Sequence, residues 1–161
     1  MANRVMNNIE IEDSRLIFKN FSGEECKYNR AGDRSFCVVI EDQAMAQTLL
    51  EDGWNVRCRQ PRDEEDTPTY YLQVAVSFRN IAPNIHMITG RKMTRMDEEM
   101  VGTLDFADIK TVDLIVRPYN WEVNGKSGVK AYLKDMYVTI EENRFAAKYA
   151  EQEAPEEVPW N

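Results

Sequence analysis

The stretch Tyr70-Tyr71-Leu72-Gln73-Val74-Ala75-Val76-Ser77-Phe78-Arg79 decides the fold class of this 161-residue chain. Its large apolar residues alternate with other residues, so that Leu72, Val74 and Val76 share one face while Gln73 and Arg79 share the other. Alternation with a period of two is typical of a half-buried β-strand, whereas the apolar face of a helix repeats about every 3.6 residues. The stretch therefore predicts a long strand with its aliphatic face on a core.

The same alternation recurs along the chain and predicts a mainly β protein. Further strands are predicted at residues 9–11, 15–21, 35–40, 54–59, 85–89, 111–117, 119–123 and 129–140. One helix is predicted at 42–53, because Asp42 is a good N-cap and Gly53 a good C-terminal stop. A short second helix is predicted within 97–107, and a hairpin turn at 124–128.

The last predicted strand contains an irregularity. Its apolar residues occupy odd positions up to Leu133 and even positions from Met136 onward. One extra residue near Lys134-Asp135 explains the change, because a β-bulge shifts the alternation by one and bends the strand. Short strands, hairpins and a bent strand favour an OB-fold-like five-stranded Greek-key barrel with extra strands or a hairpin and one or two short helices. A β-sandwich is the alternative.

Composition predicts one globular domain with a tail. The chain is 43% hydrophobic, which is enough to bury a core, and we place the domain at 1–150. Residues 151–161 contain two prolines, several acids and few apolar residues, so we predict a disordered acidic tail. No apolar stretch reaches the length of about 18 residues that a membrane span needs, and the N-terminus lacks a signal-peptide run. We therefore expect a soluble, cytoplasmic protein without a membrane partner.

The net charge of −8 is concentrated in two segments. Residues 141–161 hold six acidic and two basic residues, which gives −4, and the run Asp63-Glu64-Glu65-Asp66 gives the other −4. The rest of the chain is electrically balanced. A local basic face is therefore compatible with the acidic total.

The cysteines and the single histidine do not indicate a metal site. Cys26, Cys37 and Cys58 are widely spaced and form no C-x-x-C pair, which is typical of free thiols in a reducing compartment. His86 is the only histidine, and it has no ligand partners nearby in the sequence. We expect it to have a structural or surface role and predict no metal and no cofactor.

Catalytic motifs are also missing from the sequence. There is no Ser-His-Asp set with one histidine and no glycine-rich phosphate loop, so we predict that the protein is not an enzyme. Asp105, Asp108 and Asp113 could in principle hold Mg²⁺ for a nuclease, but their spacing matches no motif and a solvated face is the favoured interpretation.

Aromatic residues are interleaved with lysine and arginine at outward-facing positions of several predicted strands. Proteins that bind single-stranded nucleic acid stack bases on aromatic rings and hold phosphates with basic side chains, so this pattern predicts such a surface. The stacking candidates are Tyr28, Tyr119, Trp121, Tyr132 and Tyr137. The phosphate-contact candidates are Arg57, Arg59, Arg91, Lys92, Arg117, Lys130 and Lys134. Another basic cluster comprises Arg15, Lys19, Lys27, Arg30 and Arg34. An ordinary solvated sheet face is the alternative.

Three features together carry a resemblance to a known family. They are the opening strands at 9–11 and 15–21, the closing strand at 128–139, and the acidic tail. In these features the chain resembles the OB-fold single-stranded DNA-binding proteins that bacteriophages encode for replication and recombination. The resemblance implies a non-catalytic protein that coats and protects single-stranded DNA in the host cytoplasm. It leaves homo-oligomerisation open.

The tail ends in Glu156-Glu157-Val158-Pro159-Trp160, followed by Asn161. This segment is similar to the acidic, aliphatic, proline and aromatic tip of bacterial and phage single-strand binders. The resemblance implies that the tip recruits replication and recombination proteins and competes with DNA for a basic groove. In this chain the aromatic residue is not the last one, which puts in doubt any recognition of its own terminal carboxylate.

One alternative function is a virion or scaffold protein whose sheet faces pack against copies of itself. It would form large assemblies and would not bind DNA.

Overall fold

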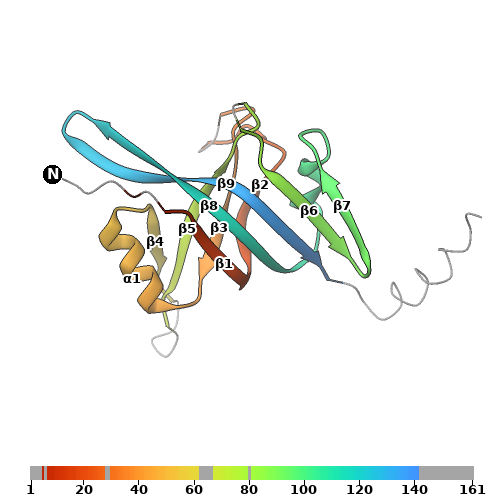
Figure 1. The fold of residues 1–161 in the computed structure, drawn as a ribbon, viewed down its shortest axis with the longest axis horizontal. Coiled ribbons are helices and arrows are strands. Elements are labelled where there is room, and N and C mark those ends of the chain that lie inside the picture. The colour runs from red at the N-terminus through yellow and green to blue at the C-terminus, as the bar shows by residue number, and fades with distance from the viewer. Residues whose placement is uncertain (1–4, 6, 28–29, 62–66, 80, 142–161) are drawn as a thin grey trace, which may run out of the picture.

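The computed structural model describes residues 5, 7–27, 30–61, 67–79 and 81–141 (Figure 1). The strands are β1 (Ile9–Ser14), β2 (Leu16–Asn20), β3 (Arg34–Ile40), β4 (Val56–Arg59), β5 (Thr69–Val76), β6 (Asn84–Thr89), β7 (Lys92–Met96), β8 (Ile109–Val123) and β9 (Lys126–Ile140). The helices are α1 (Gln43–Asp52) and the 3-10 helix η1 (Val101–Phe106). The chain is therefore mainly β, as predicted.

The sheet curves into a barrel because its first and last strands are consecutive pieces of the chain. Neighbouring strands follow the order β1-β8-β9-β5-β3-β2, and only Arg15 separates β1 from β2. The Val39 amide donates to the Arg15 carbonyl (3.0 Å) and the Ser14 hydroxyl donates to the Val39 carbonyl, which ties the end of β1 to β3. This nine-stranded mixed sheet is consistent with the predicted OB-fold-like, mainly β protein, with the β6–β7 hairpin as an addition.

Strand β9 is bent and pairs with different strands along its length. Its first part runs parallel to β5, with Ala131 opposite Val74, and its second part runs parallel to β6. Between these parts the register against β8 shifts between Ile115 and Val116, which leaves Lys134 as an extra residue. The predicted bulge is confirmed.

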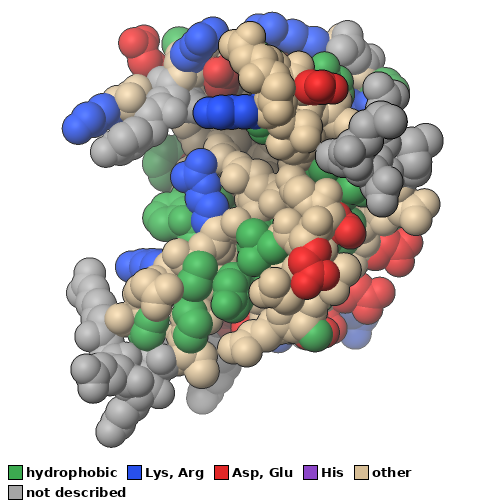
Figure 2. Space-filling view, turned by 90° about the vertical axis from the view of Figure 1, so that its left-hand side faces the viewer, with side chains coloured by type: hydrophobic (Ala, Val, Ile, Leu, Met, Phe, Trp, Pro, Cys, Tyr) green, Lys and Arg blue, Asp and Glu red, His purple; other side chains and the backbone are tan. Residues whose placement is uncertain are grey.

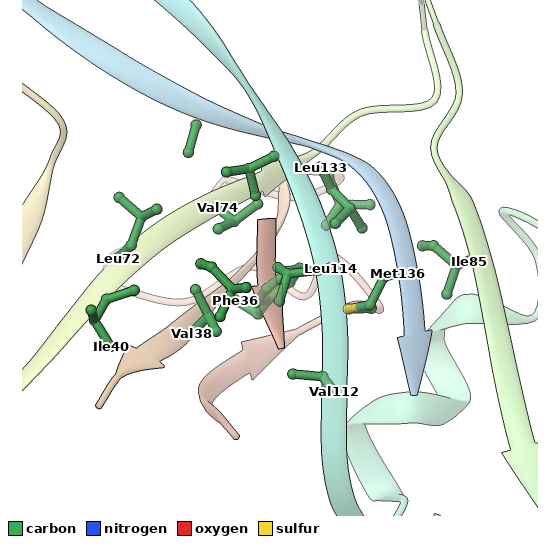
Figure 3. Close-up of a cluster of buried hydrophobic side chains, with 14 of the residues drawn as sticks. Phe36, Val38, Ile40, Leu72, Val74, Ile85, Val112, Leu114, Leu133 and Met136 are labelled. Carbon is green, nitrogen blue, oxygen red and sulfur yellow. The ribbon is translucent and has the colours of Figure 1, made fainter. Parts of the chain in front are cut away.

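The aliphatic strand faces meet inside the barrel (Figure 3). Phe36 and Leu72 pack there with Leu133 and Met136, and all four are buried. Burial of each such side chain contributes about 1.5–3 kcal/mol. The residues opposite to them in the alternation point to the outer face of the sheet, where the functional side chains must lie.

Helix α1 has the predicted ends. The Asp42 carboxylate accepts hydrogen bonds from the amides of Ala44 (2.9 Å) and Met45 (3.3 Å), and Gly53 ends the helix at φ 95°. The helix lies beside β4 at the left of Figure 1. The second predicted helix is the 3-10 helix η1, and neither helix of the described residues is long and apolar enough to cross a membrane.

Some element boundaries differ from the predictions. Residues 111–117 and 119–123 belong to a single strand, β8, which continues through Pro118. Pairing with β1 ends at Val116, so Pro118 lies on an edge, where proline is tolerated in a strand. The predicted turn at 124–128 is only two residues long, and β7 lies where no strand was predicted.

Candidate nucleic-acid interface

The far part of the β8–β9 hairpin, residues 117–132, projects beyond the barrel, and we call it the hairpin arm (Figure 1). Asn124 (φ 52°) and Gly125 (φ 79°) form its turn, as a type I′ hairpin requires positive φ at both central residues. Register pairs Arg117 with Tyr132 and Tyr119 with Lys130. Directly opposite residues share a face, so both pairs lie on one side of the arm.

Cations and aromatic rings are in contact on this side. The ring of Tyr132 meets that of Tyr119 edge to face, at 5.9 Å between centroids. The Arg117 guanidinium lies 5.4 Å and the Lys130 Nζ 5.0 Å from the Tyr132 ring centroid. Because the rings hold these cations near the stacking surface, one base and its phosphate could be bound together.

Trp121 lies against the backbone of the arm at Gly128. A Cβ at position 128 would come within 2.8 Å of the indole ring. The glycine thus allows the half-exposed indole to rest on the neighbouring strand and face the groove beside it.

A groove of about 990 Å³ runs between the arm and the outer face of β5. We call this space the groove. Its lining comprises Gly32, Asp33, Arg34, Ser35, Gly53, Trp54, Asn55, Gln73, Ala75, Val76, Ser77, Phe78, Arg79, Glu98, Trp121, Ser127, Gly128, Val129, Lys130, Ala131 and Tyr132. Three of the predicted site residues therefore lie together here: Trp121, Lys130 and Tyr132.

Figure 2 views the molecule from the side of α1 and the tip of the arm. The surface is hollowed at the left edge, and lysine and arginine side chains gather around the hollow together with hydrophobic ones. Most Asp and Glu side chains visible in this view lie on the right. A local basic face, which is compatible with the acidic net charge of the chain, is thus present on this side.

The groove is also lined by Arg34, which belongs to the basic cluster predicted at residues 15–34, and by Phe78, Asn55 and Gln73, which were not predicted as site residues. Arg34 lies over the Phe78 ring, 5.7 Å from its centroid, and pairs with Glu98 at 3.1 Å. Asn55 and Gln73 contact each other on the floor at 3.4 Å. The outward positions of Asn55 and Gln73 in predicted strands were the available signal. Phe78 lies at an even position of its predicted strand, in phase with the inward-facing Leu72 and Val76.

Arg57 and Arg59 lie on β4, outside the lining of the groove. Register pairs Arg57 with Tyr71 and Arg59 with Thr69. Asn55, which lines the groove, precedes Arg57 by two residues, so these side chains follow one another along the outer face.

The remaining predicted residues are not brought to the groove. Tyr137 stacks on His86, with ring centroids 5.0 Å apart and planes 11° apart, on the part of β9 beyond the bulge. Lys134 is the bulged residue itself, and Arg91 and Lys92 lie at the β6–β7 turn. Tyr28 and the tail residues Glu156, Glu157, Val158, Pro159 and Trp160 lie outside the described residues.

Two of the three aspartates considered for a nuclease, Asp105 and Asp113, accept hydrogen bonds from backbone amides. The Asp105 carboxylate accepts from the amides of Phe21 (2.6 Å) and Ser22 (3.0 Å), and that of Asp113 accepts from the Asp13 amide (2.8 Å). Among the described residues, no three His, Cys, Asp or Glu side chains gather as metal ligands would.

Together, fold and groove define an OB-fold-like protein with a groove of aromatic and basic side chains suited to an extended polyanion. The chain belongs to the family described as putative phage ssDNA-binding domain, whose model matches residues 1–158. No curated protein matches the sequence.

Solved structures share the fold. The C-terminally truncated single-stranded DNA-binding protein from bacteriophage Enc34 is 12% identical, with a TM-score of 0.55 over 88% of this chain and 94% of that one. The same Enc34 protein in complex with ssDNA gives a TM-score of 0.53 at 12% identity, over 89% of this chain and 96% of that one.

Proposed function

We propose that the protein binds single-stranded DNA in the groove and coats it without altering it chemically. The observation that carries the proposal is the contact of Arg117 and Lys130 with Tyr132 on the arm, at the edge of the groove. Bases would stack on Tyr132, Tyr119 and Trp121. Phosphates would lie against the two cations, and such contacts are indifferent to sequence because every base has an aromatic face.

Family membership supports a role in phage DNA replication or recombination, in the cytoplasm of the host cell. The fold shared with the Enc34 protein, which has been solved in complex with ssDNA, supports the same proposal. Arg91, Lys92, Lys134 and Tyr137 would contribute only if the DNA continues past the groove along β9 and β6.

We further propose that the acidic tail recruits replication and recombination proteins. Its acids would be drawn to basic pockets, with Trp160 as the buried aromatic anchor. When no DNA is bound, the same acids would be attracted to the basic side chains of the groove.

Fluorescence anisotropy of labelled oligo(dT), measured over a range of salt concentrations, tests the binding. For single strands, the logarithm of the affinity falls with that of the salt concentration by about 0.7 for each phosphate contact. Lys130→Ala should therefore reduce this slope by about 0.7. Tyr132→Ala should weaken binding about tenfold or more, as expected for the loss of a stacking ring.

Lys110→Ala is the matched control, because Lys110 is an exposed lysine of β8 outside the groove lining. It should leave affinity and slope unchanged. Absence of binding by the unaltered protein at low salt would overturn the proposal. If size-exclusion chromatography shows large assemblies that do not bind DNA, the scaffold alternative would be supported instead.

A further inference from the structure

Phe18 has an unusual backbone and an exposed ring. Its φ of 51° lies in the left-handed region, which bulky residues rarely adopt. The side chain is 59% exposed, so burial in the core does not compensate for the strained backbone. Strain of this kind, at an apolar residue that faces solvent, suggests a role in binding.

A bulge in β2 explains the position of the ring. The register with β3 shifts between Ile17 and Asn20, so that Phe18 and Lys19 both lie opposite Phe36. The Lys19 ammonium donates to carbonyl oxygens of Leu104 and Ala107, each at 3.1 Å, and is thus held against η1 and the residue after it. The bulge leaves Phe18 pointing into solvent.

The exposed ring stands beside a second aromatic residue on the same sheet face as the groove. Phe18 meets Tyr71 edge to face, with centroids 5.6 Å apart and planes at 66°. Tyr71 precedes Gln73 by two residues in β5, and Gln73 lines the groove. Residues two apart share a face and lie roughly 7 Å apart along a strand. The aromatic pair therefore continues the floor of the groove.

Basic side chains flank the pair. Arg57 is the register partner of Tyr71, and Arg59 is the next residue of β4 on the same face. Both are exposed, and neither forms an ion pair with another residue that the structure describes. Aromatic rings beside guanidinium groups repeat the chemistry of the hairpin arm, which favours nucleic acid over an apolar protein partner.

We propose that Phe18 and Tyr71 form a second stacking site for bases of single-stranded DNA, with Arg57 and Arg59 at the adjacent phosphates. The proposal rests on the proposed function, because it extends the DNA from the groove along β5 toward β2 and β4. A strand too short to leave the groove would not reach this second site.

Phe18→Gly tests the second site, because glycine adopts positive φ without strain and removes only the ring. Its melting temperature should stay at or above that of the unaltered protein. Oligo(dT) is titrated over the range of about 4–16 nucleotides that one OB fold can cover. The shortest oligonucleotides that bind should bind both proteins equally, and the longer ones should bind Phe18→Gly about tenfold more weakly.

Tyr71→Leu should show the same dependence on length. Phe106→Ala is the matched control, since Phe106 is 84% exposed on η1, and it should bind all lengths like the unaltered protein. Equal binding of Phe18→Gly and the unaltered protein at every length would overturn the second site and leave the proposed function intact. An equal loss at all lengths would place Phe18 in the first site and also overturn the proposal. If the unaltered protein binds no oligonucleotide, the proposed function itself fails.

Discussion

At the scale of single residues, the buried thiol of Cys37 makes stability depend on pH. Burial raises the pKa of Cys37 from an ordinary 9.0 to about 11, and the nearby Arg57 charge offsets part of this rise. An unfolded chain loses the thiol proton near pH 9, whereas the folded chain keeps it until near pH 11. Unfolding therefore releases a proton between these pH values, so stability should fall as pH rises through the window.

We expect this effect to approach about 3 kcal/mol, since the shift from 9.0 to about 11 is two pKa units at 1.36 kcal/mol each. Urea unfolding at pH 8, 9, 10 and 11 measures it. Cys37→Ala should show a smaller fall over the same window, because tyrosine and lysine titrations are common to both proteins. If the two proteins lose stability in parallel, the thiol is not responsible.

The sequence pattern identified some of the outward-facing residues and missed others. Lys130 and Tyr132 were found because alternation in a long strand assigns them to the outer face. Phe18 was not found, since Leu16, Ile17 and Phe18 are consecutive apolar residues and show no alternation from which the bulge of β2 could be recognised. The stacking of His86 on Tyr137 depends on the pairing of two residues that lie 51 positions apart in the sequence, which no local pattern records.

At the scale of elements, α1 is stabilised by its N-cap. Asp42→Ala removes the acceptor for two amides and should lower the free energy of unfolding by about 1 kcal/mol. DNA affinity should not change, because Asp42 does not line the groove. Chemical denaturation and anisotropy measure the two quantities.

Asp52→Ala is the matched control for this prediction. Asp52 is the last residue of α1 and is exposed, and a negative charge near a helix C-terminus is not stabilising. Its removal should leave stability unchanged or slightly increase it. A loss equal to that of Asp42→Ala would mean that general surface charge, and not capping, controls the helix.

The elements themselves were largely predictable, but the hairpin arm was not. Caps and turn residues mark α1 and the Asn124-Gly125 turn in the sequence. Pro118 suggested a break in β8, because a proline interrupts a central strand. Only the tertiary structure shows that β1 does not reach Pro118, since its pairing with β8 stops at Val116, and that the arm extends past the barrel.

At the scale of the whole molecule, the distribution of charge predicts an effect of the tail. Deleting residues 154–161 removes two acids, Glu156 and Glu157, together with Trp160. If the tail competes for the groove, the truncated protein should bind oligo(dT) several-fold more tightly at low salt. The difference should shrink as salt rises, since screening weakens the attraction.

Truncation should leave the melting temperature unchanged. Trp160→Ala in the full chain removes the aromatic ring and keeps the acidic residues, so it distinguishes the contribution of the ring from that of the acids. Unchanged affinity after truncation would confine the tail to partner recruitment or solubility. The division into residues 1–150 and 151–161 stays a prediction, because the described residues end at 141.

The central position of β9 has a consequence for how the chain is made. β9 is the last strand in the described sequence, yet it pairs with β5, β6 and β8. During synthesis those three strands emerge with unpaired edges before their common neighbour exists. Such edges attract other chains, so we expect the barrel to form only after β9 leaves the ribosome.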